Sequence, residues 1–193
     1  MSNLNSRNRT SGAASGRPPD DELILQIAQG KPGALEQLYR QTASAVYGYA
    51  LSILKDAAAA EDVMQDTFVN VMQSAVSYRP CGKAMAWILT ITRNLALMRL
   101  RKFENKNISF EEVLHAEDRR DHFAQSENRM VLSAVLEKLS GDERQIVMLH
   151  AISGLKHREI AEIMGIPQAT VISKYNRALG KLRALMGGDD LDR

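Results

Sequence analysis

The stretch His157–Arg183, HREIAEIMGIPQATVISKYNRALGKLR, constrains the fold of this chain more than any other segment. Two runs with helical spacing lie on either side of Gly165 and Pro167. Glycine permits a tight turn, and proline fits the first turn of the helix that follows it. The stretch therefore predicts two short helices joined by a tight turn, either as a DNA-reading helix-turn-helix or as a plain packed hairpin.

The second of these predicted helices favours the DNA-reading alternative. Its apolar residues share one face and can pack against Ile160, Ala161 and Met164 of the first helix. The outward side chains can donate to phosphates and base edges: Gln168, Thr170, Ser173, Lys174, Asn176, Arg177 and Lys181. Because a helix-turn-helix places the start of its second helix in the major groove, we expect this helix to read DNA.

The rest of the chain also has the composition of a helical protein. Hydrophobic residues make up 45% of the sequence and aromatic residues only 5%. The apolar set is mostly Leu, Ala, Ile and Met, which lose little rotamer freedom in a helix. Helical spacing recurs along the chain, and we predict an all-α protein with two helical domains joined by a flexible acidic linker.

The predicted domains occupy residues 20–103 and 127–186. Residues 1–19 are rich in Ser, Asn, Gly, Arg and Pro, which is the composition of a disordered tail, and residues 187–193 form a second tail. The predicted linker, residues 104–126, has no sustained hydrophobic period, and its acidic residues outnumber its basic ones. Such a segment would be repelled by nucleic acid.

Basic charge gathers at one end of each predicted domain, which the formal net charge of +2 hides. Seven basic residues and one acidic residue lie between residues 79 and 106, and six basic and two acidic residues lie between 156 and 183. One basic segment alone is more often a solvated face than a DNA site. Two of them, offset by acidic segments elsewhere, favour nucleic-acid binding.

Three further segments have an apolar face with helical spacing. For residues 31–56 we expect a long helix, with 42–44 as the place where it could break, and burial of Leu35, Leu38, Tyr39, Val46, Tyr49, Ala50, Ile53 and Leu54. The expected buried residues of the other two segments are Val63, Met64, Phe68, Val71, Met72, Trp87, Ile88, Ile91, Leu95 and Met98. The segment that contains Val63, Met64 and Phe68 also has a second, polar face, which carries Glu61, Asp62, Gln65 and Asp66. Such a face suits a basic helical partner.

No pattern typical of catalysis or cofactor binding is present in the sequence. The four histidines lack metal-ligand spacing, and no glycine-rich phosphate loop occurs. We therefore predict no enzyme, no catalytic residue, no metal and no cofactor. The lone Cys81 fits a reducing cytosol as an incidental thiol. With no secretory h-region and no apolar run near the roughly 20 residues of a membrane span, we expect a cytoplasmic protein without membrane insertion.

Three motifs in this order resemble the bacterial extracytoplasmic-function sigma factors, two-domain proteins built from sigma regions two and four. They are AEDVMQDTFVNVM, AWILTITRNLALMRLRK and the long run LSGDERQIVMLHAISGLKHREIAEIMGIPQATVISKYNRALGKLR. The resemblance extends from about Asp21 to Met186. It implies a protein that binds core RNA polymerase, through the beta-prime and beta subunits, recognises promoter DNA, helps to melt it and is controlled by an anti-sigma factor.

The resemblance also implies a role for each site. Glu61, Asp62, Gln65 and Asp66 match the segment that docks on the beta-prime coiled coil. The loop from Tyr78 to Met85 matches the one that captures a flipped minus-ten base. The implied minus-ten residues are Tyr78, Arg79, Lys83, Arg93, Asn94, Arg99, Arg101 and Lys102. The outward residues of 168–183 match the reader of the minus-thirty-five element.

Two positions depart from the family pattern, and two other functions stay open. Met98 stands where an acid is frequent, and Ile172 where a basic residue is common, which removes one expected DNA contact. A transcription regulator of the LuxR kind has a similar reader helix, but it needs a receiver or ligand-binding domain. A helical regulator could instead sequester a partner through the acidic helix without touching DNA.

Overall fold

The computed structural model describes residues 19–104 and 138–185, and every regular element in those two ranges is helical. The N-terminal set comprises α1 (Asp21–Ala28), α2 (Ala34–Leu54), α3 (Ala57–Ser74), the 3-10 turn η1 (Ala75–Ser77) and α4 (Ala84–Glu104). The C-terminal set comprises α7 (Gly141–Val147), the π-helical turn η2 (Met148–Ile152), α8 (His157–Met164) and α9 (Gln168–Leu185). The predicted all-α fold with two helical units is confirmed. Both tails, apart from Pro19, and the linker beyond Glu104 lie outside the described residues.

Local capping sets the boundaries of several helices. Asp56 begins α3, because its Oδ1 accepts a hydrogen bond from the N–H of Ala59 at 2.6 Å. Gly165 ends α8 with a φ of 66°, a left-handed conformation that glycine adopts without a side-chain clash. Pro167 then precedes α9, and its carbonyl accepts from the N–H of Val171 at 3.2 Å. The predicted pair of helices with a tight turn is confirmed.

Helix α2 runs without interruption through residues 42–44, so a break there does not occur. Thr42 is buried in this stretch, and its Oγ1 donates to the carbonyl of Leu38 at 2.8 Å. The hydroxyl is therefore satisfied inside the helix, and the polar residue fits the buried face without ending it.

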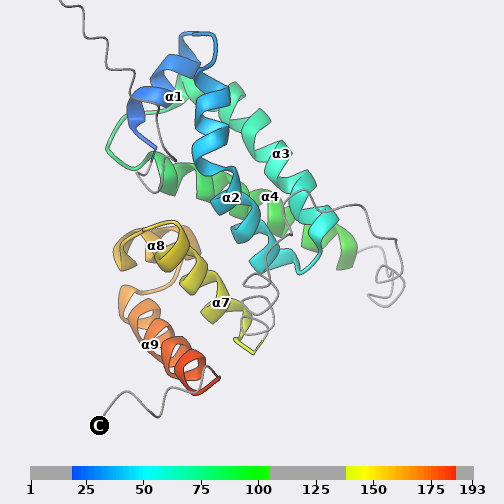
Figure 1. The fold of residues 1–193 in the computed structure, drawn as a ribbon, viewed down its shortest axis with the longest axis vertical. Helices are drawn as coiled ribbons and strands as arrows, with labels where there is room; N and C mark the ends of the chain where they lie inside the picture. The colour runs from blue at the N-terminus through cyan, green and yellow to red at the C-terminus, as the bar shows by residue number, and fades with distance from the viewer. Residues whose placement is uncertain (1–18, 105–137, 186–193) are drawn as a thin grey trace, which may run out of the picture.

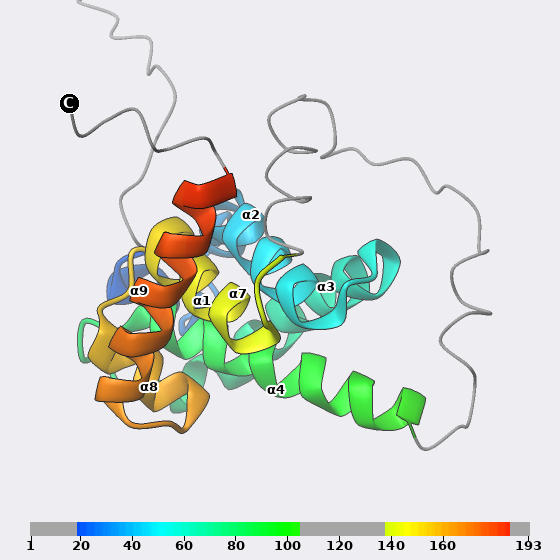
Figure 2. The ribbon, with the colours of Figure 1, turned by 90° about the horizontal axis from the view of Figure 1, so that it is seen from below.

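The hydrophobic core joins the two sets of helices. Leu38, Val46 and Tyr49 of α2 are buried in the same cluster as Ile88 of α4 and the C-terminal residues Ile146, Leu149 and Ile160. In Figures 1 and 2, α7 and α8 lie beside α2 and α4. The two units therefore pack against each other in this structure.

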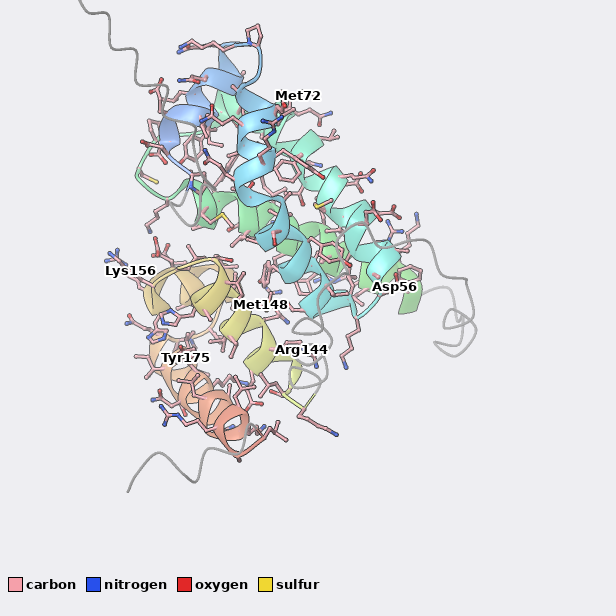
Figure 3. The ribbon with its side chains drawn as sticks, viewed as in Figure 1. Asp56, Met72, Arg144, Met148, Lys156 and Tyr175 are labelled. Carbon is pink, nitrogen blue, oxygen red and sulfur yellow. The ribbon has the colours of Figure 1, made fainter. Side chains whose placement is uncertain are left out.

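Close packing at this junction depends on Gly48 of α2. A Cβ atom added at Gly48 would lie 2.7 Å from Cε of Met148. Met148 and Arg144 both lie where the C-terminal helices face α2 (Figure 3). The missing side chain at position 48 therefore leaves the room that Met148 occupies.

Two methionines that we expected to be buried are exposed instead. Met72 of α3 is 50% exposed and Met98 of α4 is 60% exposed, so both expectations were wrong. Val71 and Ala96 occupy the inward positions of these turns and are fully buried. Each methionine lies at the edge of the buried face of its helix, where helical spacing alone does not decide whether a residue is buried or exposed. Tyr39, which we also expected to be buried, is 37% exposed, and its ring packs on Phe68 with 4.8 Å between the centroids.

Within the described ranges, no helix combines the length and the apolar character that crossing a membrane requires.

Candidate nucleic-acid interface

The acidic face of α3 is exposed. Glu61, Asp62, Gln65 and Asp66 are all exposed on this helix. Asp62 also contacts the basic helix α4, because its Oδ2 accepts from Nη2 of Arg99 at 2.6 Å. The structure therefore brings the predicted polymerase-docking face against one edge of the predicted minus-ten surface.

The polar and basic residues of α4 divide into two groups. Asn94, Arg101 and Lys102 are exposed, and the partly exposed Arg99 lies 5.9 Å from the ring centroid of Phe103. Arg93 has a different environment. Its Nε donates to the carbonyl of Ile163 in α8 at 3.1 Å, and its Nη1 is buried. Arg93 therefore contacts protein in this arrangement, while the other group faces solvent.

A pocket of about 390 Å³ lies beside the loop that precedes α4. Its walls come from the loop, from α4 and from α8, and include Tyr78, Arg79, Cys81, Lys83, Trp87, Thr90, Glu159, Glu162 and Ile163. Tyr78 is buried and its ring lies 4.7 Å from that of Trp87, whereas Arg79 is exposed. The walls from the loop and α4 are basic and aromatic, as suits a nucleobase with its phosphate, whereas the wall from α8 contributes Glu159 and Glu162.

An ion pair closes that wall. Nζ of Lys83 lies 2.8 Å from Oε2 of Glu162, and this hydrogen bond holds the pKa of Glu162 below its ordinary value. Two predicted minus-ten residues, Lys83 and Arg93, are thus engaged by α8. This contact between the two units has no counterpart in the sequence predictions, because it joins residues that are far apart in the chain and share no local pattern.

Helix α9 presents two different polar faces. Gln168, Ser173, Asn176 and Arg177 are exposed, and Thr170 is half-buried. Lys174 and Lys181, which we expected to face DNA, instead pair with α7 through Asp142 and Glu143, each at 2.7 Å. Their spacing explains this, because each lysine lies three residues after an inward residue, Val171 or Ala178.

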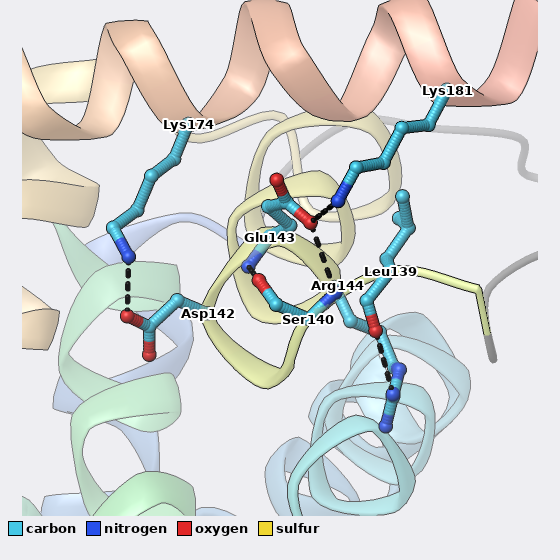
Figure 4. A network of polar contacts seen from close by, with 7 residues as sticks. All are labelled: Leu139, Ser140, Asp142, Glu143, Arg144, Lys174 and Lys181. Carbon is cyan, nitrogen blue, oxygen red and sulfur yellow. Dashed lines mark hydrogen bonds and ion pairs between the residues drawn. The ribbon is translucent and has the colours of Figure 1, made fainter.

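The partner of Lys181 is a buried carboxylate (Figure 4). Glu143 accepts from the N–H of Ser140 at 2.9 Å, and its own N–H donates to Oγ of Ser140, which completes a capping box at the start of α7. Burial raises the pKa of Glu143, but the bonds from Lys181 and Ser140 outweigh it and lower that pKa to about 2. The neighbouring Arg144 donates to the carbonyls of Leu139 and of Ser52 in α2.

Sequence reasoning missed a cluster of three rings that joins both helices of the helix-turn-helix to η2. His150 and His157 stack with 4.6 Å between centroids, and Tyr175 of α9 lies 4.7 Å from His150. Nδ1 of His150 is 2.7 Å from the carbonyl of Leu155. Burial and the neighbouring His150 lower the pKa of His157. Within the described parts of the chain, no group of three potential ligands could hold a metal ion.

Family models match both units of the chain. Sigma-70 region 2 matches residues 38–106, and Sigma-70 region 4 matches residues 129–182. The chain is 30% identical to the ECF RNA polymerase sigma factor SigK of Mycobacterium sp. (strain KMS), over 86% of this chain and 90% of that protein. It is 28% identical to the RNA polymerase sigma factor CarQ of Myxococcus xanthus, over 86% and 97% of the two chains.

Two solved structures have the same fold. One is the sigma factor RpoE of Bartonella quintana in complex with the anti-sigma factor NepR, with 27% identity, a TM-score of 0.67 and coverage of 83% of this chain and 99% of that chain. The other is CnrH in complex with the cytosolic domain of CnrY, with 26% identity, a TM-score of 0.62 and coverage of 89% and 99%. Two matched regions, a helix-turn-helix and a 30% identical relative show that the chain belongs to the ECF RNA polymerase sigma factors.

Proposed function

We propose that this sigma factor docks on core polymerase with α3 and reads promoter DNA with two surfaces, one on each unit. Residues 20–103 act as region two and residues 127–186 as region four. The observation that carries the proposal is the separation of charge. The acidic face of α3 is exposed on a different helix from the donor-rich faces of α4 and α9. A basic polymerase surface is therefore attracted to α3, and the DNA backbone is attracted to α4 and α9.

The minus-ten surface consists of the loop and pocket before α4 together with the exposed polar residues of that helix. Extracting a base from the stack costs a few kcal/mol, which a pocket and phosphate contacts must offset. The side of the pocket formed by the loop and α4, with Arg79, Lys83 and Trp87, supports base capture once α8 has moved away. Asn94, Arg101 and Lys102 support contacts to the melted strand. No catalytic step is needed, because binding energy opens the duplex.

The minus-thirty-five surface is the exposed face of α9. Gln168, Ser173, Asn176 and Arg177 are the base- and phosphate-contacting residues, with Thr170 at their edge. Lys174 and Lys181 contribute long-range attraction to the phosphates, while their ion pairs hold α9 on α7. The residues that read sequence thereby lie between 168 and 177, in the N-terminal part of α9, as expected for a helix-turn-helix.

The two surfaces must separate before both can bind one promoter. Elements near positions minus ten and minus thirty-five are about 25 base pairs apart, or about 85 Å of DNA at 3.4 Å per base pair. In the structure α8 packs on α4 and engages Lys83 and Arg93. The described arrangement is therefore a closed form, and polymerase binding favours an open one.

Regulation by a protein partner fits this closed form. A relative of the same fold has been solved with an anti-sigma factor, and a partner of that kind that binds both units would hold this chain closed. We place the protein in the cytoplasm, where core polymerase and promoter DNA are available.

Run-off transcription with purified core polymerase tests the proposal. A library of genomic fragments is transcribed with and without the protein, and we expect transcripts with defined start sites only when the protein is present. If the protein shifts fragments in a binding assay without core polymerase and yields no new transcript, a regulator of the LuxR kind is the better account.

A further inference from the structure

The carboxylate of Asp21, the first residue of α1, connects that helix to the loop before α4. Its Oδ1 accepts a hydrogen bond from Oη of Tyr78 at 2.6 Å, and its Oδ2 accepts from the N–H of Gly82 at 2.5 Å. The two donors lie at opposite ends of a five-residue stretch, and both are more than fifty residues away in sequence. One side chain therefore ties together both ends of the loop.

The loop has few other restraints. Arg79, Pro80, Cys81 and Gly82 are all exposed, and Gly82 has a left-handed φ of 72°. Tyr78 is the anchored end, because it is buried and its ring packs on Trp87. An exposed loop without a fixed partner would lose conformational entropy whenever it closed on a ligand. The carboxylate bonds lower that loss by fixing the loop beforehand.

The ionisation of the pair agrees with this geometry. Burial raises the pKa of Asp21, but the hydrogen bonds from Tyr78 and from the backbone of Gly82, Cys81 and Ala84 outweigh it, so the pKa lies below its ordinary value. Burial and the bond to Asp21 raise the pKa of Tyr78. At neutral pH a charged acceptor therefore faces a protonated donor, which is the stronger kind of hydrogen bond.

We infer that Asp21 is a positioning residue for base capture, because it holds the loop from Tyr78 to Lys83 in the shape that forms one wall of the minus-ten pocket. Arg79, Cys81 and Lys83 of this loop line the pocket, while Asp21 itself does not. Asp21 thus acts on the base only through the loop. The inference rests on the proposed minus-ten role of this loop.

The test measures DNA binding by the assembled holoenzyme. The probe is a forked duplex whose single-stranded segment is selected by the wild-type holoenzyme from a randomised pool. Asp21→Asn removes the charge with little change in shape, and Tyr78→Phe removes only the hydroxyl donor. The matched control is Asp20→Asn, because Asp20 is exposed and its side chain makes no capping bond.

We expect Asp21→Asn to weaken fork binding by about tenfold, the loss typical of one charge-assisted hydrogen bond, and to relax base preference at the captured position. Tyr78→Phe weakens binding by less than Asp21→Asn, since it removes only one of the two bonds to the carboxylate, whereas asparagine lacks the charge and turns an N–H donor toward one of the two loop donors. In the double variant the two effects are less than additive, because both substitutions act on the contact between Asp21 and Tyr78. Core affinity and binding to a minus-thirty-five duplex stay at wild-type values, while the melting temperature falls, because the lowered pKa of Asp21 means that its carboxylate also stabilises the fold. Asp20→Asn behaves as wild type in every assay.

Two results overturn the inference. Wild-type fork affinity in Asp21→Asn shows that the carboxylate does not position the loop. A parallel fall in fork binding, core affinity and binding to the minus-thirty-five duplex shows a purely structural role. If the wild-type holoenzyme selects no sequence from the pool, the proposed function itself fails, and the inference with it.

Discussion

Nζ of Lys181 in α9 lies 2.7 Å from Oε2 of Glu143, a carboxylate that is buried at the start of α7. The pair holds the reader helix α9 against α7, and it uses a lysine that the sequence pattern assigned to DNA. The basic residues of α9 therefore have two roles, since some form ion pairs with α7 and others are free to contact DNA. Variants at the two kinds of position separate these roles.

We predict that Lys181→Ala lowers the free energy of unfolding by about 1–2 kcal/mol, since it leaves the buried carboxylate without its cation while Lys181 itself is partly solvated. Urea unfolding followed by circular dichroism measures this. Arg183→Ala is the control, because it removes an exposed charge from the same helix. An equal effect of the two variants would show that the ion pair contributes nothing specific.

Glu143 also predicts how stability depends on pH. Its folded pKa of about 2 lies below the ordinary 4.5, so its contribution is complete above pH 4.5 and is lost as the pH falls toward 2. After allowance for the solvation of Lys181, the contribution is about 2 kcal/mol. The unfolding free energy of wild type minus that of Glu143→Gln, measured from pH 7 to pH 3, should be constant at first and then shrink. A difference that grows toward low pH would contradict the assignment.

The positions of the lysines of α9 show how far the sequence can predict this site. Helical spacing predicted that the apolar residues of 168–183 share one face, and Val171 and Ala178 are buried on it. The same spacing places Lys174 and Lys181 one turn further along that face. In the sequence, the adjacent acids Asp142 and Glu143 were the signal that could have predicted ion pairs with these lysines. Residue type alone could not separate the two roles, because a lysine binds phosphate and carboxylate equally well.

Ile172 gives a gain-of-function prediction. It is 38% exposed on α9 next to Ser173. The family resemblance implies a basic residue at this position. Ile172→Arg adds a phosphate contact, so duplex affinity should rise at low salt and the slope of log K against log salt should steepen by about 0.9. Titrations at several salt concentrations measure it, with Ile172→Gln as the uncharged control. An unchanged slope would indicate that position 172 does not face the backbone.

The closed form predicts a measurable change of shape. Glu162→Lys places two ammonium groups together at Lys83, and Gly48→Leu fills the room that Met148 needs. The double variant should have a larger radius of gyration than wild type in small-angle X-ray scattering. Glu36→Lys, which changes an exposed charge on α2, should not. Identical scattering curves for wild type and the double variant would mean that these contacts do not hold the units together.

The packing of the two units marks the limit of prediction from sequence. Composition and spacing were sufficient for an all-helical chain, for the turn at Gly165 and for the exposed acids of α3, because each depends on neighbouring residues. The contacts of Arg93 with Ile163 and of Asp21 with Tyr78 join residues 70 and 57 positions apart. No local period encodes such contacts, since they depend on how complete surfaces fit.

Footprinting of the holoenzyme on a selected promoter tests the central claim that one chain reads two elements with separate surfaces. Hydroxyl radicals report the upstream contact, and permanganate reports unpaired thymines downstream. We predict both signals for wild type, loss of the upstream protection alone for Arg177→Ala, and loss of the permanganate signal with upstream protection intact for Arg101→Ala with Lys102→Ala. Loss of both signals together in either variant would contradict the division between α4 and α9.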